Sequence, residues 1–449
     1  MTFPDAVFAA LRDEPGRVVV EHESRQVTTT ELLDMVARIA GGLRARGVKR
    51  GTGIAMDTSV TPEAIAAYLA GYALGAMVVG IRPGFSAKQL EHIRSAGVTV
   101  MVTDDEIKSL LATESEPLLV TSRPQDVARL VYTSGSTGLP KGCVFTYESM
   151  TPSSKWRDAA GLAGRMDRHL VFGSLASAVV YDYMEQALLQ GGVIVIADEP
   201  RFPAVIEKYR ITFTIMNVPR LYAMLDSLRD NPVDTSSLKG MLVAGSPLAP
   251  HRLAEAVERF GPVVFQGYGQ SEAGSLTLLT PSDISSGVLR SVGRPVEGVE
   301  IDIRDGEIWV RHPALMREYW DNAGETAAVL VDGWLRTRDI GRLDDGFLYL
   351  TGRARDVVIV GGYPVYLGPV EGVLATHPDV DQAYVVGSAD EQIHAFVIPV
   401  AGREPSVEAL STLVETELGP ASVPVSFRFV ASVPIAASGK PDKQALLGE

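Results

Sequence analysis

A loop of small and hydroxyl residues at positions 132–142 carries the clearest chemical signal in the sequence. It contains the run YTSGSTGLPKG and follows a short apolar stretch typical of the end of a strand. Such a loop leaves backbone N–H groups and hydroxyls free to surround an anion, and its glycines allow close approach of the backbone. The pattern predicts a phosphate-binding loop, and therefore an enzyme that uses a nucleotide.

The spacing of this loop differs from that of P-loop NTPases. Their motif requires a glycine, four further residues, and then Gly-Lys followed by Ser or Thr. Counted from Gly135, the fifth residue is Pro140, and Lys141 is followed by Gly142 instead of a hydroxyl residue that could hold Mg²⁺. A flexible Gly/Ser linker is the structural alternative, but apolar runs flank the loop and a cation closes it.

Residues 133–142 resemble the TSGSTGxPKG loop of the ANL superfamily of adenylate-forming enzymes, which contains acyl- and aryl-CoA synthetases, the adenylation domains of peptide synthetases, and luciferases. Further segments resemble other motifs of this family in the same order: QGYGQSE at 266–272 (YGxTE), GWLRTRD at 333–339 (GWxxTGD), GRARD at 352–356 (GRxKD), GGYPVY at 361–366 (GGxNVYP) and PIAASGK at 434–440 (PxxxSGK). The sequence departs from the family pattern at Ser271, Arg338 and Pro364, where Thr, Gly and Asn are usual.

The resemblance implies two successive reactions. A carboxylate first attacks the α-phosphorus of ATP, which produces an acyl-adenylate and pyrophosphate, and a thiol then attacks the adenylate. Because negative charge develops on the phosphates, the site requires cations and N–H donors directed at them. The implied cofactors are ATP, Mg²⁺ and CoA, and the implied enzyme is an AMP-forming acyl- or aryl-CoA ligase.

The resemblance assigns the first reaction to residues from several motifs. Lys440 is expected to neutralise charge in the transition state of adenylation, and Glu272 to bind Mg²⁺, a hard cation that prefers oxygen ligands. Asp339 is expected to accept hydrogen bonds from both ribose hydroxyls, with Arg353 bracing the ribose. The other residues of the predicted nucleotide site are Thr133, Ser134, Gly135, Ser136, Thr137, Gly138, Lys141, Gly245, Ser246, Pro247, Gln266, Gly267, Tyr268, Gly269 and Ser271.

The second reaction requires a domain movement in this family. The C-terminal domain rotates about a residue that corresponds here to Arg355. The loop that contains Gly361, Gly362 and Tyr363 is then expected to replace Lys440 at the active site and to line the pantetheine tunnel. The resemblance therefore separates the residues needed for adenylation from those needed for thioester formation.

The acyl pocket is predicted to contain Ala176, Asn217, Gly269 and Gln270. Many relatives carry an aromatic residue or His at the position of Ala176, and amino-acid-activating domains place an Asp nearby. Because Ala176 has no charge, an amino acid substrate is disfavoured. The small size of Ala176 favours a bulky or ring-containing acid.

Two further positions bear on the substrate. Arg220 follows Pro219, where a small Thr is common in the family. Arg220 either pairs with a second carboxylate of the acid or faces solvent from a helix, and the sequence favours the second interpretation. The run TRD at 337–339 also occurs in ortho-succinylbenzoate–CoA ligases, which share the compact length of this chain.

The composition predicts a globular protein of more than one domain. The chain has 449 residues, more than a single core usually holds, and 46% of them are hydrophobic and 21% charged. Its net charge of −14 disfavours non-specific binding to nucleic acid or acidic membranes. The only cysteine, Cys143, excludes internal disulfides, fits a reducing cytoplasm and is expected to serve packing.

An uncharged run at residues 64–81 is long enough to cross a membrane. Thr61, Pro62 and Glu63 are nevertheless typical of the start of an ordinary helix, with a hydroxyl cap and proline in the first turn. We therefore predict a buried helix followed by a buried strand, and no membrane span.

Alternating helix and strand patterns predict an α/β fold. Thr28 and Glu31 form a capping box before an apolar stripe at positions 32, 36, 39 and 43. Helix and strand patterns then alternate, which argues for mainly parallel sheets covered by helices, with a β-rich subdomain after about residue 281. The predicted organisation is a large N-terminal adenylation domain at 1–354 and a small, mobile α+β cap domain at 355–449, with a hinge near residue 355.

The sequence is compatible with more than one acceptor for the acyl group. The loop at 361–366 favours CoA, yet Pro364 departs from the usual loop, so an acyl-AMP ligase that serves a carrier-protein pantetheine or an amine is the second hypothesis. A catalytically inactive binding or scaffold protein is the third, and the intact Lys440, Glu272, Asp339 and Arg353 argue against it. We expect a cytoplasmic monomer or homodimer that acts on a small-molecule carboxylic acid.

Overall fold

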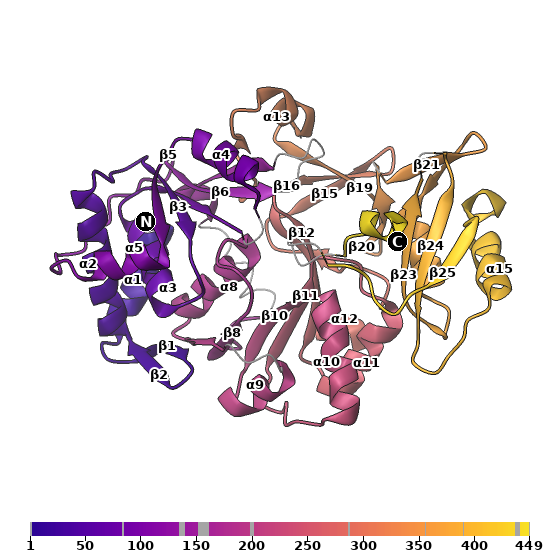
Figure 1. Ribbon diagram of the computed structural model, residues 1–449, viewed down its shortest axis with the longest axis horizontal. Helices are drawn as coiled ribbons and strands as arrows, with labels where there is room; N and C mark the ends of the chain where they lie inside the picture. Colours follow the sequence, from indigo (N-terminus) through magenta and orange to yellow (C-terminus); the bar gives the residue numbers. More distant parts are fainter. Residues whose placement is uncertain are drawn as a thin grey trace.

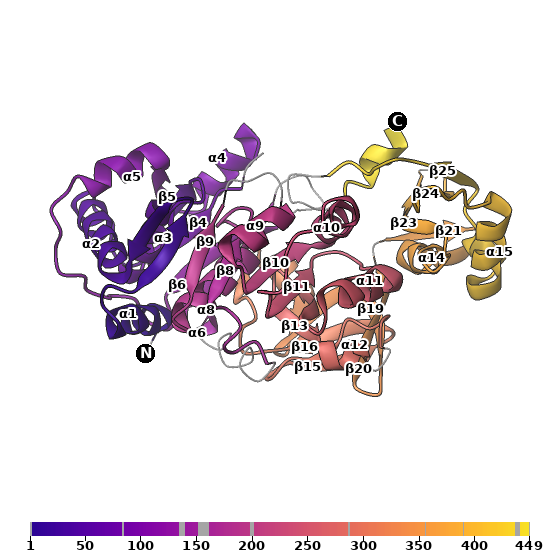
Figure 2. The same cartoon turned by 90° about the horizontal axis from the view of Figure 1, so that it is seen from below.

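A computed structural model of the chain describes residues 2–82, 85–133, 140–150, 161–197, 202–285, 288–354, 356–388, 390–435 and 441–448. The molecule is elongated (Figure 1), with the first part of the chain at one end and the C-terminal segment, residues 356–448, at the other. A view turned by 90° shows the same separation (Figure 2). The predicted residues of the nucleotide site come mainly from the middle of the molecule.

One sheet near the N-terminus has the strand order β17-β7-β6-β4-β3-β5. Strands β5, β3, β4 and β6 run parallel, and β7 and β17 are antiparallel to their neighbours. The strands are β3 (Gly53–Asp57), β4 (Met77–Gly80), β5 (Val98–Thr103), β6 (Val127–Thr133), β7 (Lys141–Thr146) and β17 (Glu318–Tyr319). The accompanying helices are α2 (Thr29–Ala45), α3 (Pro62–Ala73), α4 (Ala87–Ser95) and α5 (Asp104–Leu111).

Local sequence signals explain the first of these helices. The Thr28 hydroxyl accepts a hydrogen bond from the backbone N–H of Glu31 at 3.2 Å, and the Glu31 carboxylate accepts one from the backbone N–H of Thr28 at 2.7 Å. This capping box satisfies N–H groups that the helix itself leaves without partners. The predicted stripe of Leu32, Val36, Ile39 and Leu43 is fully buried, which is worth roughly 2 kcal/mol for each side chain.

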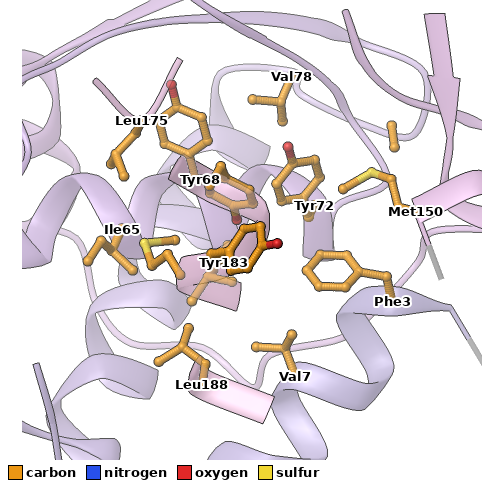
Figure 3. Close-up of a cluster of buried hydrophobic side chains, with 14 of the residues drawn as sticks. Phe3, Val7, Ile65, Tyr68, Tyr72, Val78, Met150, Leu175, Tyr183 and Leu188 are labelled. Carbon is orange, nitrogen blue, oxygen red and sulfur yellow. The ribbon is translucent and has the colours of Figure 1, made fainter. Parts of the chain in front are cut away.

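The uncharged run at 64–81 is a buried helix and strand, as predicted. Helix α3 begins after Thr61, whose hydroxyl accepts a hydrogen bond from the backbone N–H of Ala64 at 3.1 Å. Tyr68 and Tyr72 of this helix pack with Phe3 of α1 (Phe3–Asp13) and Tyr183 of α8 (Ala178–Leu189) in a shared core (Figure 3). Among the residues that the structure describes, no helix is both long and apolar enough to cross a membrane.

A larger sheet has the strand order β14-β13-β12-β11-β10-β8-β9-β1-β2. Its central strands from β12 to β1 run parallel, and both edges are antiparallel. The strands are β1 (Val18–His22), β2 (Arg25–Thr28), β8 (Arg168–Val171), β9 (Val193–Ile196), β10 (Phe213–Asn217), β11 (Gly240–Ala244), β12 (Val264–Gln270), β13 (Gly274–Leu279) and β14 (Arg294–Pro295). Helices α9 (Phe202–Tyr209), α10 (Val218–Asp230) and α11 (Pro250–Phe260) pack with this sheet in a second core.

The later part of the chain is richer in strands, as predicted. An antiparallel sheet joins β15 (Glu300–Arg304), β16 (Glu307–Arg311), β18 (Leu330–Val331), β19 (Trp334–Asp344) and β20 (Phe347–Arg353), beside the short helix α13 (Ala323–Val329). The C-terminal segment contains β21 (Val357–Val360), β22 (Tyr363–Tyr366), β23 (Val380–Gly387), β24 (Ile393–Pro399), β25 (Ser426–Phe429), α14 (Leu367–Leu374) and α15 (Val407–Leu418), with an apolar core of its own. The predicted fold class is confirmed.

Candidate active site

The predicted site residues gather at the carboxyl ends of parallel strands. Strand pairing places Asn217 of β10 opposite Ala244 of β11, and Ala244 opposite Gly267 of β12. The segments 245–247 and 267–270 therefore leave the same edge of the sheet side by side. In open α/β sheets this edge is where ligands bind.

Asp339 is the centre of the best-formed part of the site. It lies on β19, is 4% exposed, and is opposite Arg353 of β20, whose Nε is 3.0 Å from its Oδ1. Tyr268 Oη and Gln270 Nε2 of β12 each donate a hydrogen bond to Asp339 Oδ2 at 2.6 Å. Burial and the neighbouring carboxylate raise the pKa of Tyr268, so this phenol stays protonated and donates.

The predicted metal-binding residue has a partner that the sequence did not indicate. Glu272 Oε1 accepts a hydrogen bond from Tyr319 Oη at 2.8 Å. Tyr319 belongs to β17, which pairs with β7 so that Tyr319 is opposite Cys143. The end of β17 therefore brings Glu272 next to the strand that follows the predicted phosphate loop. Burial, followed by the Glu272 charge, raises the pKa of Tyr319.

The cations near this point share one carboxylate. Lys141 forms an ion pair with Glu325 of α13, and its Nζ lies 5.3 Å from the centre of the Tyr319 ring. The guanidinium of Arg338 lies 3.5 Å from the same carboxylate. Arg338 has a φ of 60°, in the left-handed region that glycine adopts most easily, at a position where the family motif has glycine. No motif marked Glu325, because it comes from a short helix between motifs.

Several predicted residues lie outside the described residues. These are Ser134, Gly135, Ser136, Thr137, Gly138, Arg355 and Lys440. Thr133 and Lys141, which flank the phosphate loop, are opposite each other on β6 and β7. The tip residues Gly361, Gly362 and Tyr363 of the β21–β22 hairpin are exposed, Tyr363 by 69%, and the hairpin lies away from the ends of β10–β12 (Figures 1 and 2).

The remaining residues predicted for the nucleotide site lie along the same carboxyl edge of the large sheet. Gly245, Ser246 and Pro247 follow β11 and are exposed or half-buried, and Ser271 follows β12. Gln266 is buried, and within the described part of the chain its Oε1 has no hydrogen-bond partner. A buried acceptor without a donor is costly unless a ligand supplies one, so this side chain fits a site for a ligand with N–H or O–H groups.

The predicted acyl-pocket residues come from several elements. Asn217 ends β10 and Gly269 lies near the end of β12, two strands away in the large sheet, and Gln270 contacts Asp339. Ala176, in the segment that follows β8, lies against Gly80 at the end of β4: a side chain at Gly80 would come 2.5 Å from the Ala176 Cα. A cavity of about 20 Å³, lined in part by Ala176, Tyr68 and Tyr181, adjoins this contact.

Arg220 is only partly exposed to solvent, and it has an aromatic contact that the favoured expectation did not include. Its side chain is half-buried, and its guanidinium carbon lies 4.6 Å from the centre of the Phe172 ring. The sequence alone could not show this contact, because Phe172 follows β8 and the adjacency of β8 and β10 is a property of the sheet.

An ion-pair network joins the C-terminal segment to the rest of the molecule. Arg252 of α11 is 2% exposed and hydrogen-bonds to Asp226 at 2.8 Å and Glu255 at 2.7 Å. Its Nε lies 3.2 Å from Asp381, the second residue of β23. Because this arginine is buried, removing one of its carboxylate partners costs more than breaking an exposed ion pair. The Arg252–Asp381 contact therefore favours the observed placement of the C-terminal segment.

We expect Asp381→Asn to reduce the free energy that favours this placement of the C-terminal segment by about 1–2 kcal/mol, because a buried arginine loses one of its partners. Because the tip of the β21–β22 hairpin is exposed in this placement, we expect acyl-adenylate formation to fall about 3- to 10-fold while thioester formation from supplied acyl-adenylate is unchanged. Single-turnover measurements of both half-reactions test this. Asp379→Asn is the control, since Asp379 pairs with Arg403 inside the C-terminal segment. An equal effect of both variants contradicts the prediction.

Comparison with known proteins places this fold and site in a family. The family model of the AMP-binding enzymes matches residues 7–320, and that of the AMP-binding enzyme C-terminal domain matches residues 369–440. The chain belongs to this family and is an adenylate-forming ligase of the ANL superfamily, which confirms the resemblance noted in the sequence.

Individual relatives cover almost the whole chain. The medium/long-chain-fatty-acid–CoA ligase FadD8 of Mycobacterium tuberculosis is 30% identical over 97% of this chain and 88% of its own length. The 2-succinylbenzoate–CoA ligase of Geobacillus kaustophilus is 30% identical over 95% of this chain and 94% of its own length. The structure of the amide bond synthetase McbA from Marinactinospora thermotolerans superposes with a TM-score of 0.88, 31% identity and 99% coverage of both chains.

Proposed function

We propose that this enzyme activates a carboxylic acid with ATP through an acyl-adenylate and then forms the thioester with CoA. The observation that carries the proposal is the buried Asp339, held by Tyr268, Gln270 and Arg353 at the carboxyl edge of the large sheet. A carboxylate fixed in this way presents its remaining acceptor capacity to a pair of ribose hydroxyls. Relatives that are named CoA ligases support the choice of acceptor.

The donor set near Glu272 fits Mg²⁺ bound together with phosphates. Within the part of the chain that the structure describes, no group of three or more His, Cys, Asp or Glu side chains could hold a metal by itself. Mg²⁺ commonly takes one or two carboxylates and completes its shell with water and phosphate oxygens, and it supplies neutralisation of phosphate charge. We propose that Glu272 is the protein ligand and that Tyr319 orients its carboxylate.

We expect Glu272→Gln to reduce adenylation about 100-fold and to raise the Mg²⁺ concentration needed for half-maximal rate, because an amide is a weaker ligand than a carboxylate. Tyr319→Phe keeps the carboxylate and is expected to cost about 10-fold, the lower end of the effect of losing a residue that orients a metal ligand. The measurement is pyrophosphate release over a Mg²⁺ titration. Glu318→Gln, which changes a half-buried carboxylate that pairs with Arg317 one residue before Tyr319, is the control. An unchanged Mg²⁺ requirement in Glu272→Gln argues against the assignment.

Two domains that move relative to each other account for the two reactions. We propose the boundary near residue 355, between β20 and the C-terminal segment, whose separate core supports independent movement. In this proposal Lys440 serves adenylation, and Gly361, Gly362 and Tyr363 serve thioester formation after rotation about Arg355.

We expect Arg355→Pro to leave pyrophosphate formation within about threefold of the wild type and to slow thioester formation about 10- to 100-fold, because proline restricts the backbone rotation. Arg355→Ala is the matched control, since it removes the same side chain and keeps the backbone free. Pyrophosphate and thioester are measured separately in one reaction. Equal losses of both products contradict a hinge at this position.

The experiment that tests the proposed function is ATP–pyrophosphate exchange with a panel of carboxylic acids, followed by CoA addition. The panel includes the acids named for relatives: a medium-chain fatty acid, ferulic acid, indoleacetic acid and 2-succinylbenzoic acid. Exchange with at least one acid and a thioester with CoA are expected. No exchange with any acid favours the catalytically inactive alternative.

A different acceptor is the second candidate. Pro364 in the thiol-acceptor loop departs from the family pattern, McbA is an amide bond synthetase, and a relative that is 28% identical is named a fatty acid–[acyl-carrier-protein] ligase. Supplying CoA, a phosphopantetheinylated carrier protein and a simple amine in parallel distinguishes these acceptors. We further propose a cytoplasmic monomer or homodimer, for which the single cysteine and the acidic net charge are the support.

A further inference from the structure

Arg220 is held in a defined position at the start of α10. The side-chain Oδ1 of Asn217 accepts a hydrogen bond from the backbone N–H of Arg220 at 3.0 Å and caps the helix. The guanidinium carbon lies 4.6 Å from the centre of the Phe172 ring and 5.9 Å from that of Phe202. These two rings are themselves 4.5 Å apart in an edge-to-face arrangement, so the aromatic support of the arginine is well packed.

Among the residues that the structure describes, Arg220 is a half-buried cation with no carboxylate partner. Within the described ranges no Asp or Glu side chain forms an ion pair with it, in contrast to Arg129, which pairs with Asp182 at 2.6 Å, and Arg168, which pairs with Glu21 at 2.6 Å. Loss of water lowers the pKa of Arg220, yet an arginine remains charged at neutral pH. A guanidinium that contacts ring faces keeps its N–H donors at the edge of its plane, where they suit a carboxylate.

The sheet places the start of α10, the helix that carries Arg220, near the predicted nucleotide site. Asn217 ends β10 and is in the same row of the sheet as Gly267 of β12, two strands away; the next residue, Tyr268, contacts Asp339. Neighbouring strands are about 4.8 Å apart, so Asn217 and Gly267 are separated by roughly 10 Å. An acid whose reacting carboxylate lies beside the nucleotide can extend along this edge toward Arg220.

We propose that Arg220 is a specificity-determining residue that pairs with a second carboxylate at the far end of the acid, so that dicarboxylic acids are the preferred substrates. The proposal rests on the proposed acid activation at this edge of the sheet. The competing explanation is that Arg220 only packs on Phe172 and Phe202. The two explanations differ in whether the loss of the charge matters for every acid or only for acids with a second carboxylate.

The test uses pairs of acids that share one skeleton. One pair is 2-succinylbenzoate and 4-oxo-4-phenylbutanoate, which lacks the ring carboxylate; the other is nonanedioate and nonanoate, which tests a span of about 10 Å. Arg220→Met keeps apolar contact with the rings and removes the charge. We expect its kcat/KM in ATP–pyrophosphate exchange to fall about 100-fold for a dicarboxylate, as in the loss of one partner of a desolvated charge pair, and less than about threefold for its monocarboxylate partner.

Two further variants separate charge from packing. Arg220→Lys keeps a cation and is expected to retain part of the preference for dicarboxylates. Arg165→Met removes an arginine that also contacts an aromatic ring: its guanidinium carbon lies 5.3 Å from the centre of the Phe265 ring. Arg165 precedes the start of β8, whereas Phe172, which contacts Arg220, follows the end of β8. Arg165→Met is expected to leave both acids within about twofold, and thermal unfolding of all variants checks that they fold.

Calorimetric binding of the same acids keeps the test independent of turnover. If Arg220→Met binds only the dicarboxylate more weakly, the result supports the proposed role of Arg220, whether or not exchange is observed. Absence of exchange in the wild type counts against the proposed acid activation, and not against the role of Arg220. Equal losses for both members of a pair, a wild-type preference for the monocarboxylates, or no binding of either dicarboxylate overturns the role of Arg220.

Discussion

Replacing Lys440 with alanine is expected to reduce acyl-adenylate formation about 100- to 1000-fold while leaving transfer of a supplied acyl-adenylate to CoA within about threefold. A cation aimed at charge that develops in the transition state is worth this much in a site that excludes water. The expectation derives from the PIAASGK segment at 434–440, because Lys440 lies outside the described residues. Single-turnover assays with ATP and acid, and separately with synthetic acyl-adenylate and CoA, measure the two half-reactions.

The controls for this prediction address charge and folding. Lys239→Ala removes a surface lysine that pairs with Asp167 at the opposite end of the large sheet, and it is expected to change neither half-reaction. If Lys440→Ala slows both half-reactions equally, Lys440 acts on the folding or docking of the C-terminal segment instead of on the transition state.

Replacing Asp339 with alanine is expected to reduce kcat/KM for ATP about 100- to 1000-fold. The variant loses the proposed acceptor of the ribose hydroxyls, and it also leaves Tyr268 Oη without its acceptor and Arg353 without its ion-pair partner. Buried polar groups that lose their partners cost about 1–3 kcal/mol of stability each, so a lower thermal unfolding midpoint is expected as well. Asp339→Asn keeps an acceptor and is expected to be less severe on both counts.

A nucleotide that lacks one ribose hydroxyl distinguishes loss of the ribose contact from loss of protein stability in Asp339→Ala. The wild type is expected to prefer ATP over 2′-deoxy-ATP, and Asp339→Ala is expected to lose that preference because the contact is already absent. Asp344→Ala is the control: it changes an exposed residue at the end of the same strand and is expected to keep the preference for ATP over 2′-deoxy-ATP. A preference for ATP that survives in Asp339→Ala shows that the ribose is bound elsewhere.

Local signals in the sequence predicted much of the fold. The capping box at Thr28 and Glu31, the buried stripe that follows it and the start of α3 after Thr61 depend on residues close together in the chain. Such signals act through helix caps and side-chain periodicity, which do not require knowledge of distant contacts. The β-rich region after residue 281 was predicted for the same reason, from short strands separated by turn residues.

Contacts between distant segments were beyond this kind of inference. Tyr319 and Glu325 belong to no motif, yet they contact Glu272 and Lys141 because β17 pairs with β7. The Arg252–Asp381 ion pair depends on where the C-terminal segment lies. Arg220 was expected to face solvent because its neighbours in sequence give no sign of Phe172, which reaches it only through the adjacency of β8 and β10.

The sequence by itself determined the family, the order of its motifs and the residue types available for adenylation, including Glu272, Asp339, Arg353 and Lys440. Those assignments need only side-chain chemistry and spacing along the chain. The tertiary structure alone decided that Tyr268, Gln270 and Arg353 surround Asp339, and that Arg220 is a half-buried cation with aromatic support. The physical reason is that strand order and register, set by the burial of whole sheets, determine which distant side chains meet.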